Sequence, residues 1–578
     1  MSEQRRDRAD ASREAILAGR TTLGIELGST RIKACLVDAE DPSLVLAVGS
    51  HAWENEFVDR RWTYSLDAVW NGLQAAYADL VADVDRRHHV RPETFGVIGV
   101  SAMMHGYLAF DAAGELLVPF RTWRNTSTGP AAAELSELFG VNIPLRWSVA
   151  HLAQAVLDEE PHVPRIDMLT TLAGYVHWRL TGRRVLGVGD ASGMFPIGAA
   201  PEGAAPEGPA PEGGAPEGAA PVGAAPEGGA RIAGSAAAHV YDAELLERFD
   251  ERFAARASGL RLAAVLPEVL PAGAAAGELT AEGAALLDPT GTLRPGVALC
   301  PPEGDAGTGM VATNAVSPRT GNVSAGTSIF AMVVLERPLA HAHDEVDLVT
   351  TPAGDPVAMV HCNNGASELA AWAGVFTRFA ELAAGRDATV DVDAVYELLF
   401  SEALEGEPDA GGVLAYNTLA GEPIVELPEG RPMIVRTPDS RLTLANVMRA
   451  QLYGVYGTLA LGMRVLTDEG VALDRMYAHG GIFRTAGVAQ RLLAGALAAP
   501  VAVGDTASEG GAWGMAVLAA YAAEPSGRDL GAYLDDHVFA QSAFAIADPD
   551  PDDVAGFATY LGRYRAGLAA EAAAVEAL

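Results

Sequence analysis

The sequence predicts an α/β fold with two similar lobes that face one cleft. Strand-like apolar segments alternate with amphipathic helical segments through most of the chain. Two strand turns that carry glycine and hydroxyl residues recur far apart, at 24–30 and 321–328. The length of 578 residues suits about two to four compact units. The Pro/Gly-rich run 289–304 is the expected passage between the lobes.

The first lobe is expected to begin with a strand hairpin. β-branched segments at 21–26 and 32–37 predict two strands, and a tight turn at 27–30 joins them. An amphipathic helical pattern follows at 66–84, and a short apolar strand at 95–101. This succession is the α/β layering on which the fold class rests.

The last third of the chain repeats the alternation. Helices are expected at 442–466, 485–497 and 511–522, and short strands at 476–479 and 501–503. The second lobe is therefore predicted to be α/β as well.

Composition and charge exclude several classes of function. Lys and Arg number 40 against 75 Asp and Glu, and the net charge of -35 repels nucleic acid and anionic lipid surfaces. The uncharged stretches 94–110 and 320–335 are shorter than the ~20 apolar residues that cross a bilayer. Cys35, Cys300 and Cys362 match no disulfide framework or zinc spacing. We therefore expect a cytoplasmic protein that binds neither nucleic acid nor a membrane.

Two segments lie outside the α/β pattern. Residues 1–20 are polar and lack the apolar core of a secretory signal, which predicts a frayed extension or a short helix. Residues 199–230 carry proline at regular five-residue intervals among Ala, Glu and Gly, which prevents a packed core. We expect this low-complexity segment to be an inert surface insertion, and a partner-binding role is the alternative.

The first candidate site is the turn after the opening strand. Glu26 ends the strand, and the turn that follows is rich in small and hydroxyl-bearing residues, namely Gly28, Ser29 and Thr30. Backbone N–H groups and hydroxyls in such a turn suit phosphate oxygens. Glu26 suits a magnesium ion, and Arg31 or Lys33 suits charge balance. An ordinary polar hairpin turn is the alternative.

Two further glycine-bearing segments lie in the second lobe. In the turn at 321–330, small and hydroxyl residues between strand formers suit a second phosphate clamp, namely Gly326, Thr327 and Ser328. Gly480 and Gly481 lie at a strand end before a helix, where the base or ribose of a nucleotide can approach the backbone. Each segment alone is also compatible with a simple turn.

An isolated acid and a histidine complete the candidates. Asp305 lies among small residues, so a substrate can lie against its carboxylate, which can accept a hydroxyl proton as a general base. A turn-forming aspartate is the alternative. Met104 and His105 end a predicted strand, and Trp123 and Arg124 follow. For Met104 and His105 the alternative is packing in the core.

The order and spacing of these five segments resemble the FGGY family of carbohydrate kinases, from Thr21 to about Ala523. The resemblance implies two actin-like (ribonuclease-H-like) domains flanking a catalytic cleft. The N-terminal domain would span 21–315 and the C-terminal domain 316–578. In the family, the two glycine turns are the first and second phosphate motifs of an ATP site, and 478–481 here corresponds to the adenosine motif.

The same resemblance makes Asp305 the catalytic base, because the family's base lies in a Gly-Asp segment shortly before the second phosphate motif. Met104-His105-Gly106 resembles the sugar-contacting Met-His-Gly of xylulokinases, and Trp123-Arg124-Asn125 looks like their Trp-Asn-Asp region. The implied reaction is ATP-dependent phosphorylation of the terminal hydroxyl of a ketose, with D-xylulose as the first candidate and Mg²⁺ near Glu26. Many family members are dimers, so we expect a homodimer.

Three positions depart from the family pattern. Glu26 stands where most members have Asp, Ala306 stands where xylulokinases usually carry Asn, and Gln451-Leu452-Tyr453-Gly454 replaces a usual Glu-Gly. Phosphotransfer is still expected, but the acceptor stays open among xylulose, ribulose, another ketopentose, a tetritol and a larger ketose. The alternative from another class is a non-catalytic ATP-binding regulator or an actin-like ATPase. A glycosidase is disfavoured, since no sugar-platform motif accompanies Glu26 and Asp305.

Overall fold

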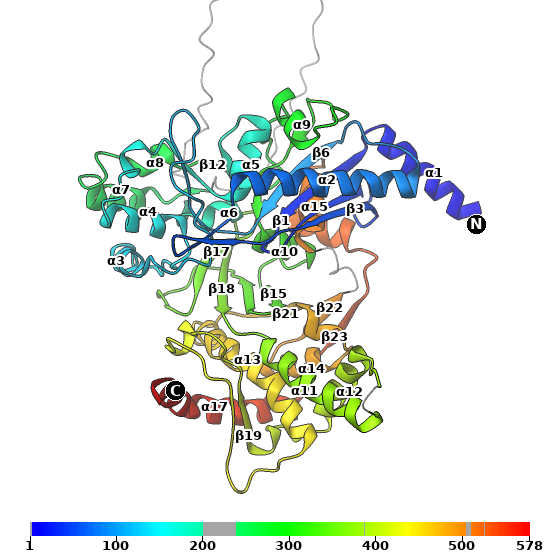
Figure 1. The fold of residues 1–578 in the computed structure, drawn as a ribbon, viewed down its shortest axis with the longest axis vertical. Helices are drawn as coiled ribbons and strands as arrows, with labels where there is room; N and C mark the ends of the chain where they lie inside the picture. Colours follow the sequence, from blue (N-terminus) through cyan, green and yellow to red (C-terminus); the bar gives the residue numbers. More distant parts are fainter. Residues whose placement is uncertain (1–2, 200–238, 386–387, 505–509, 525, 578) are drawn as a thin grey trace, which may run out of the picture.

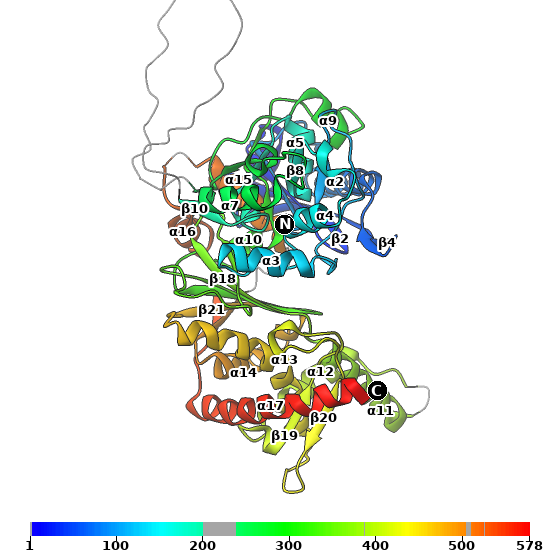
Figure 2. The ribbon, with the colours of Figure 1, turned by 90° about the vertical axis from the view of Figure 1, so that its left-hand side faces the viewer.

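The computed structural model describes residues 3–199, 239–385, 388–504, 510–524 and 526–577. Two helix-covered sheets lie one above the other along the long axis of the molecule (Figure 1), and the view from the side shows the same two lobes (Figure 2). Apart from Ala199, the predicted insertion at 199–230 lies outside the described residues.

Six strands form the sheet of the first lobe: β1 (Thr21–Leu27), β2 (Arg31–Asp38), β3 (Val45–Ala52), β6 (Val97–Ala102), β13 (Ala298–Leu299) and β14 (Glu303–Gly304). Their order is β13-β6-β1-β2-β3, with β14 also beside β6. β1 pairs antiparallel with β2 and parallel with β6. The predicted hairpin and the strand that follows it therefore form the centre of the sheet.

Helices cover both faces of this sheet. α2 (Leu66–His88) packs on β3, where a side chain at Gly49 would collide with the α2 backbone. On the opposite face, α15 (Gly510–Ala522) packs on β1, where a side chain at Gly24 would collide with the α15 backbone. In space α15 lies with the first lobe, although the chain reaches it through the second.

Seven strands form the sheet of the second lobe: β15 (Thr320–Ala325), β16 (Ile329–Val334), β17 (Asp347–Thr350), β18 (Pro356–Cys362), β21 (Arg475–Gly480), β22 (Val501–Gly504) and β23 (Phe544–Ala547). Their order is β17-β18-β16-β15-β21-β22-β23. β15 pairs antiparallel with β16 and parallel with β21, which repeats the relation of β1 to β2 and β6. The prediction of two similar α/β lobes is confirmed.

The second lobe carries five longer helices and a separate strand pair: α11 (Ser367–Ala384), α12 (Val392–Leu404), α13 (Leu444–Asp468), α14 (Val488–Leu497), α17 (Pro551–Ala577), β19 (Val413–Tyr416) and β20 (Met433–Arg436). α13 is buried along most of its length, which places it at the centre of this lobe's core. The helices expected at 442–466 and 485–497 are thus confirmed in the second lobe, and the helix expected at 511–522 is α15, which packs on the first lobe.

Smaller elements surround the first lobe or join the lobes: α1 (Glu3–Leu17), β4 (Glu56–Val58), β5 (Arg61–Thr63), β7 (Leu108–Phe110), α3 (Gly129–Phe139), α4 (Ser148–Leu157), β8 (Met168–Thr170), α5 (Leu172–Thr181), β9 (Val185–Gly187), α6 (Val188–Ser192), β10 (Ile197–Ala199), β11 (His239–Tyr241), α7 (Ala243–Phe253), α8 (Leu262–Val265), β12 (Glu268–Leu270), α9 (Ala281–Leu287), α10 (Asp305–Ala312), α16 (Leu530–Tyr533) and the π-helical turn η5 (Leu534–Val538). The polar N-terminal segment forms a helix, α1. Within the described ranges, no helix combines the length and the apolar composition that a membrane crossing requires.

The predicted position of the connection between the lobes is wrong. The Pro/Gly-rich run 289–304 contributes β13 and β14 to the first sheet, because Ala298–Leu299 and Glu303–Gly304 pair with β6. The chain instead crosses to the second lobe after α10, at 313–319.

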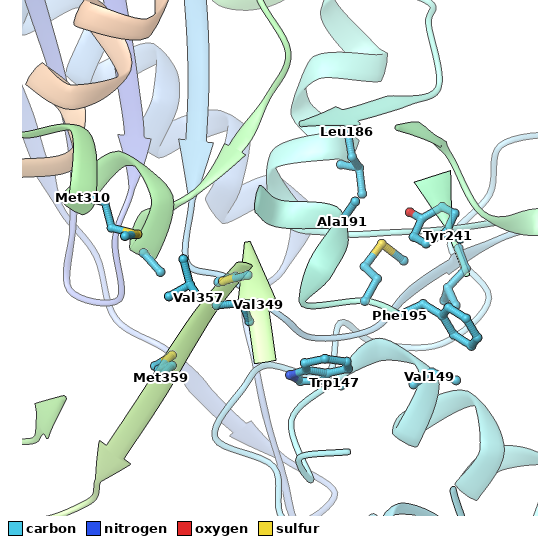
Figure 3. Close-up of a cluster of buried hydrophobic side chains, with 14 of the residues drawn as sticks. Trp147, Val149, Leu186, Ala191, Phe195, Tyr241, Met310, Val349, Val357 and Met359 are labelled. Atoms are coloured by element: carbon cyan, nitrogen blue, oxygen red, sulfur yellow. The ribbon is translucent and has the colours of Figure 1, made fainter. Parts of the chain in front are cut away.

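A hydrophobic cluster joins the two lobes. Val349 of β17 and Val357 of β18 lie in the same buried cluster as Trp147 of the first lobe (Figure 3). The N–H of Thr350 also donates to Ser192 Oγ of α6 at 3.1 Å. The β17–β18 hairpin of the second lobe is therefore seated on the first lobe.

Candidate active site

A cavity of about 380 Å³ lies between the lobes. Its first-lobe wall includes Glu26, Ser29, Lys33, Met104, His105, Trp123, Arg146 and Asp305, and its second-lobe wall includes Asn322, Ser324, Ser328, Phe330, Met359, His361 and His479. The ends of β1 and β15, where the two predicted phosphate turns begin, meet at this cavity. Each of the five candidate segments thus contributes at least one residue to this cavity, and the segment at 478–484 contributes only His479.

Asp305 is placed by β14 and α10. β14 pairs with β6, and the chain turns into α10 at Asp305. The backbone N–H of Met104 donates to Asp305 Oδ1 at 3.0 Å. Burial raises the pKa of the Asp305 carboxyl, and the Met104 N–H opposes that rise. One carboxylate oxygen is thus fixed, and the group is more basic than an exposed aspartate, which suits a proton acceptor.

Glu26, the penultimate residue of β1, lies on the same cavity wall. Burial raises the pKa of Glu26 to about 7, while Lys33, opposite on β2, lowers it and Asp305 raises it. A side chain at Gly511, in the first turn of α15, would collide with the Glu26 carboxylate. Glycine at the start of α15 therefore leaves the room that this carboxylate occupies.

The first turn reaches the cavity mainly through one residue. Ser29 lines the cavity, whereas Thr30 and Arg31 are exposed beside it. The Arg31 guanidinium donates to Ser50 Oγ at 3.2 Å. Gly28 closes the turn by donating its N–H to the Arg31 carbonyl at 3.1 Å. The turn is the predicted hairpin, and Ser29, Thr30 and Arg31 are exposed on it.

The second turn lies between two cavities. Ser328 lines the first cavity, Thr327 is exposed, and Gly326 lines a second cavity of about 730 Å³. This second cavity also has Gly481 on its wall, with apolar and aromatic side chains from the second-lobe helices, including Leu369, Tyr396, Phe400 and Ile482. The turn at 326–328 is therefore the bridge from one cavity to the other.

Gly480 has a structural reason to be glycine. Its φ is +120°, and a side chain there would collide with the Ala325 carbonyl on the neighbouring strand. Gly481, in contrast, has open space where its side chain would be. The group that approaches Gly480 closely is therefore the Ala325 carbonyl of β15. Gly481 is the residue that borders the second cavity.

The predicted acceptor side has Met104, His105 and Trp123 on the first cavity wall. His105 Nδ1 lies 3.2 Å from the Gly193 carbonyl, and burial holds the pKa of the imidazole well below its ordinary value. The ring is therefore neutral, with the proton on Nδ1 and an acceptor lone pair on Nε2. Such a ring suits a hydroxyl-bearing ligand.

Arg124 does not belong to this wall. Its guanidinium lies over the ring of Trp62, with 4.4 Å between them, and the side chain is exposed. The prediction that Arg124 contacts the substrate directly therefore differs from the structure. Its neighbour Trp123 lines the cavity, and the Arg124 guanidinium also lies over the Trp123 ring, 5.9 Å from its centroid.

Sequence reasoning missed Arg146 and His361, which also line the cavity. Arg146, from the loop between α3 and α4, forms an ion pair with Asp347 of β17. Asn142 Nδ2 donates to Asp347 Oδ1 at 3.0 Å. Burial and Arg146 lower the pKa of His361 to about 3, so His361 is neutral. No local motif marks these residues, because the docking of β17 and β18 brings them to the cavity.

A second omission is a pair of buried carboxyl groups behind Asp305. Glu303 accepts hydrogen bonds from the N–H of Gly189 at 3.2 Å and of Asp190 at 2.9 Å. Burial raises the pKa of Glu303 to about 8 and that of Asp190 to about 7. The Glu303 carboxyl ties β14 to α6, and the Asp190 carboxyl accepts from Thr171 Oγ1 at 2.6 Å. Glu303 therefore supports the strand that leads into Asp305.

Solved structures share this fold. A xyloylose kinase from Brucella ovis gives a TM-score of 0.70 at 20% sequence identity, over 95% of this chain and 99% of that chain. A xylulose kinase from Rhodospirillum rubrum gives 0.69 at 20% identity, over 95% and 99%. A gluconate kinase from Lactobacillus acidophilus gives 0.69 at 15% identity, over 96% and 98%. The fold is that of the two-domain, actin-like sugar kinases.

Family models define the protein more closely. The model for the N-terminal domain of the FGGY family of carbohydrate kinases matches residues 21–197, and that for the C-terminal domain matches 321–523. The chain belongs to the FGGY family of carbohydrate kinases and is a phosphotransferase. A comparison with curated proteins finds no match. The resemblance seen in the sequence is confirmed at the level of the family.

Proposed function

We propose that the protein phosphorylates the terminal hydroxyl of a ketose with ATP, and that D-xylulose, converted to D-xylulose 5-phosphate, is the first acceptor to test. The observation that carries this proposal is the position of Asp305. Its carboxylate shares a cavity with Met104 and His105, and Ser29 and Ser328 of the two turns line the same cavity from the two lobes. Two of the similar solved structures are named as kinases of this sugar, which supports the choice.

In the proposed reaction, Asp305 accepts the proton of the acceptor hydroxyl while the hydroxyl oxygen attacks the γ-phosphorus of ATP. The bond from the γ-phosphorus to the bridging oxygen breaks, and ADP leaves with the electron pair. Because the Met104 N–H holds Oδ1, Oδ2 is the oxygen that takes the proton. Nε2 of the neutral His105 accepts a hydrogen bond from another sugar hydroxyl.

We assign the nucleotide to the two turns and the second cavity. A volume of about 730 Å³ whose wall combines apolar and aromatic side chains with polar ones such as Asp393 and Arg484 suits an adenosine group. The phosphates would then extend past the second turn toward the first, so that the residues assigned to the nucleotide are Gly28, Ser29, Thr30, Arg31, Gly326, Thr327, Ser328, Gly480 and Gly481.

Glu26 fits the role of a magnesium ligand. Among the described residues, no group of three or more His, Cys, Asp or Glu side chains is arranged to hold a metal ion by itself. Mg²⁺ commonly takes one or two carboxylates and completes its shell with substrate phosphates and water. Glu26 supplies one such carboxylate on the cavity wall. The ion, when bound, would neutralise charge on the phosphates.

The test is a panel of acceptors with ADP release as the measurement. Purified protein is assayed with D-xylulose, D-ribulose, other ketoses, tetritols, glycerol and gluconate. We expect ADP release that depends on one ketose and that falls about 10²–10⁴-fold in Asp305→Ala. Near-normal turnover in this variant would refute the role of Asp305.

A second candidate is an ATPase or ATP-binding regulator, favoured by Glu26 and by Ala306 next to Asp305. It predicts ADP release without dependence on any acceptor, or no ADP release at all. Dependence on ribulose, a polyol or gluconate would instead keep the phosphotransfer and replace the acceptor.

A further inference from the structure

Two aromatic residues hold the first turn by its carbonyl groups. Trp53, which follows β3, donates from Nε1 to the Gly28 carbonyl at 2.7 Å and from its backbone N–H to the Thr30 carbonyl at 3.1 Å. Tyr64, which follows β5, donates its hydroxyl to the Ser29 carbonyl at 2.6 Å. Both side chains are buried, and their rings stack with centroids 4.2 Å apart. We call Trp53 and Tyr64 the aromatic brace.

The aromatic brace fixes where the turn presents its donors. In a planar trans peptide, the N–H points away from the carbonyl of the same peptide unit. The carbonyls of three successive residues are bound to the brace, so the N–H groups of Ser29, Thr30 and Arg31 are directed away from it. Successive N–H groups of this kind form an anion-binding concavity, and Ser29 lies on the cavity wall.

The aromatic brace is also connected to the acceptor side of the cavity. Trp62 lies two residues before Tyr64, and its N–H donates to Asn125 Oδ1 at 2.9 Å. Asn125 Nδ2 donates back to the Trp62 carbonyl at 2.9 Å, and Arg124 stacks on the Trp62 ring. Trp123, in the same loop, lines the cavity. A short, doubly hydrogen-bonded path thus links the acceptor loop to the first turn.

We propose that the aromatic brace positions the first turn for the phosphoryl group and couples that position to occupancy of the acceptor site. Trp53 and Tyr64 are then positioning residues for phosphotransfer. An acceptor that packs on Trp123 steadies the loop, and the path through Trp62 steadies Tyr64 and the turn. Without an acceptor the turn is less well fixed, which limits the hydrolysis of ATP by water. This inference rests on the proposed kinase function.

Tyr64→Phe tests the coupling, because it removes one hydroxyl and keeps the stacked ring. We expect about a tenfold lower kcat with the acceptor found in the panel and an acceptor KM within about twofold of the wild type. The ratio of acceptor-independent ADP release to sugar phosphorylation should rise by about the same factor. The matched control is Tyr77→Phe, since the buried Tyr77 hydroxyl has no hydrogen-bond partner in the described chain.

Binding measurements separate positioning from a general loss of structure. Trp53→Phe keeps an aromatic ring and loses the Nε1–H bond to Gly28. By calorimetry, both variants should bind ATP several-fold more weakly and adenosine with unchanged affinity, because only the phosphates contact the turn.

Two outcomes would overturn the inference. Variants of Trp53 and Tyr64 that match Tyr77→Phe in kcat, in the ADP-release ratio and in ATP affinity would show that the brace is only structural. A wild-type protein that phosphorylates no acceptor would remove the proposed function and the coupling together, whereas an active wild type with unaffected brace variants would remove the coupling alone.

Discussion

The two glycine turns follow the same strand pattern but are supported in different ways. In the first lobe, side chains of Trp53 and Tyr64 bind the carbonyls of the turn. In the second lobe, the support is backbone: the N–H of Gly365 donates to the Thr327 carbonyl at 2.7 Å, and that of Ala366 to the Gly326 carbonyl at 2.8 Å. The two sheets therefore share the strand pairing around the turn, but different groups bind the carbonyls of the turn in each lobe.

This difference predicts where each turn is sensitive to substitution. A Cβ at Gly365 would lie 2.5 Å from the Gly326 carbonyl oxygen and 2.7 Å from that of Ser328. A Cβ at Gly28 would meet only the Arg31 carbonyl oxygen, at 3.1 Å. The second turn needs glycine in the segment that supports it, whereas the first turn needs particular side chains.

The largest effect is expected at Asp305, which lines the cavity between the two turns. Asp305→Asn keeps the shape of the side chain and removes the base, so kcat should fall about 10²–10⁴-fold. Affinity for ADP, measured by calorimetry, should stay within about twofold, since the two turns are untouched. A parallel loss of ADP binding would mean that Asp305 supports the turns rather than the chemistry.

A matched pair of glycine substitutions tests the comparison directly. Gly365→Ala should displace the second turn and lower kcat/KM for ATP by up to about 10²-fold, because a displacement of about 1 Å can cost that much. Gly28→Ala should cost much less, since only one contact at 3.1 Å is tightened. Steady-state kinetics with ATP as the varied substrate measures both. Equal effects would show that the two turns are supported alike.

The contact that brings the turns together should give an intermediate effect. Asp347→Asn removes the charge that pairs with Arg146 across the lobes. The free energy of unfolding should fall by about 2 kcal/mol, and the acceptor KM should rise. The control is Asp111→Asn, whose partner Arg165 is largely exposed, so this variant should lose less stability than Asp347→Asn. Urea unfolding of both variants measures the difference.

The last comparison concerns the pH dependence of stability, with no direct contact to either turn. Burial raises the pKa of Glu303 from 4.5 to about 8, so between these values the folded protein holds a proton that the unfolded chain has lost. Stability should therefore fall as pH rises through this range and level off above it. Glu303→Gln should flatten this slope in urea unfolding at several pH values.

The second lobe offers the matching test. Glu422 accepts hydrogen bonds from Asn364, directly before Gly365, and burial raises the pKa of Glu422 to about 7. Glu422→Gln should flatten the slope only between about pH 4.5 and 7. Identical profiles for the two variants would argue against separate contributions from the two lobes.

Local sequence patterns were enough to predict the turns and an acidic residue that lines the cavity, Asp305. Gly28–Thr30, Gly326–Ser328 and Asp305 lie in contiguous runs of small residues. Such a run predicts a turn from its own residues, without knowledge of distant contacts. The repeated alternation of strands and helices was enough to predict two α/β lobes. These features depend on neighbours in the chain.

The rest of the site depends on how distant segments dock. Arg146 and His361 reach the cavity because the β17–β18 hairpin is seated on the first lobe, and no neighbouring residue signals that contact. Arg124 lies outside the cavity wall because its guanidinium stacks on Trp62, which is distant in sequence, and the loop motif carries no sign of that contact. The run 289–304 was wrongly predicted to connect the lobes because proline and glycine are as typical of an irregular segment at the edge of a sheet as of a connection between domains.

The return of α15 to the first sheet has a consequence for dissecting the protein. The chain passes between the lobes after α10, again between β22 and α15, and again between η5 and β23. A fragment that ended near residue 315 would leave bare the face of β1 that carries Gly24. Cutting the gene in two would therefore yield a soluble half only if the missing helix were supplied as a separate peptide.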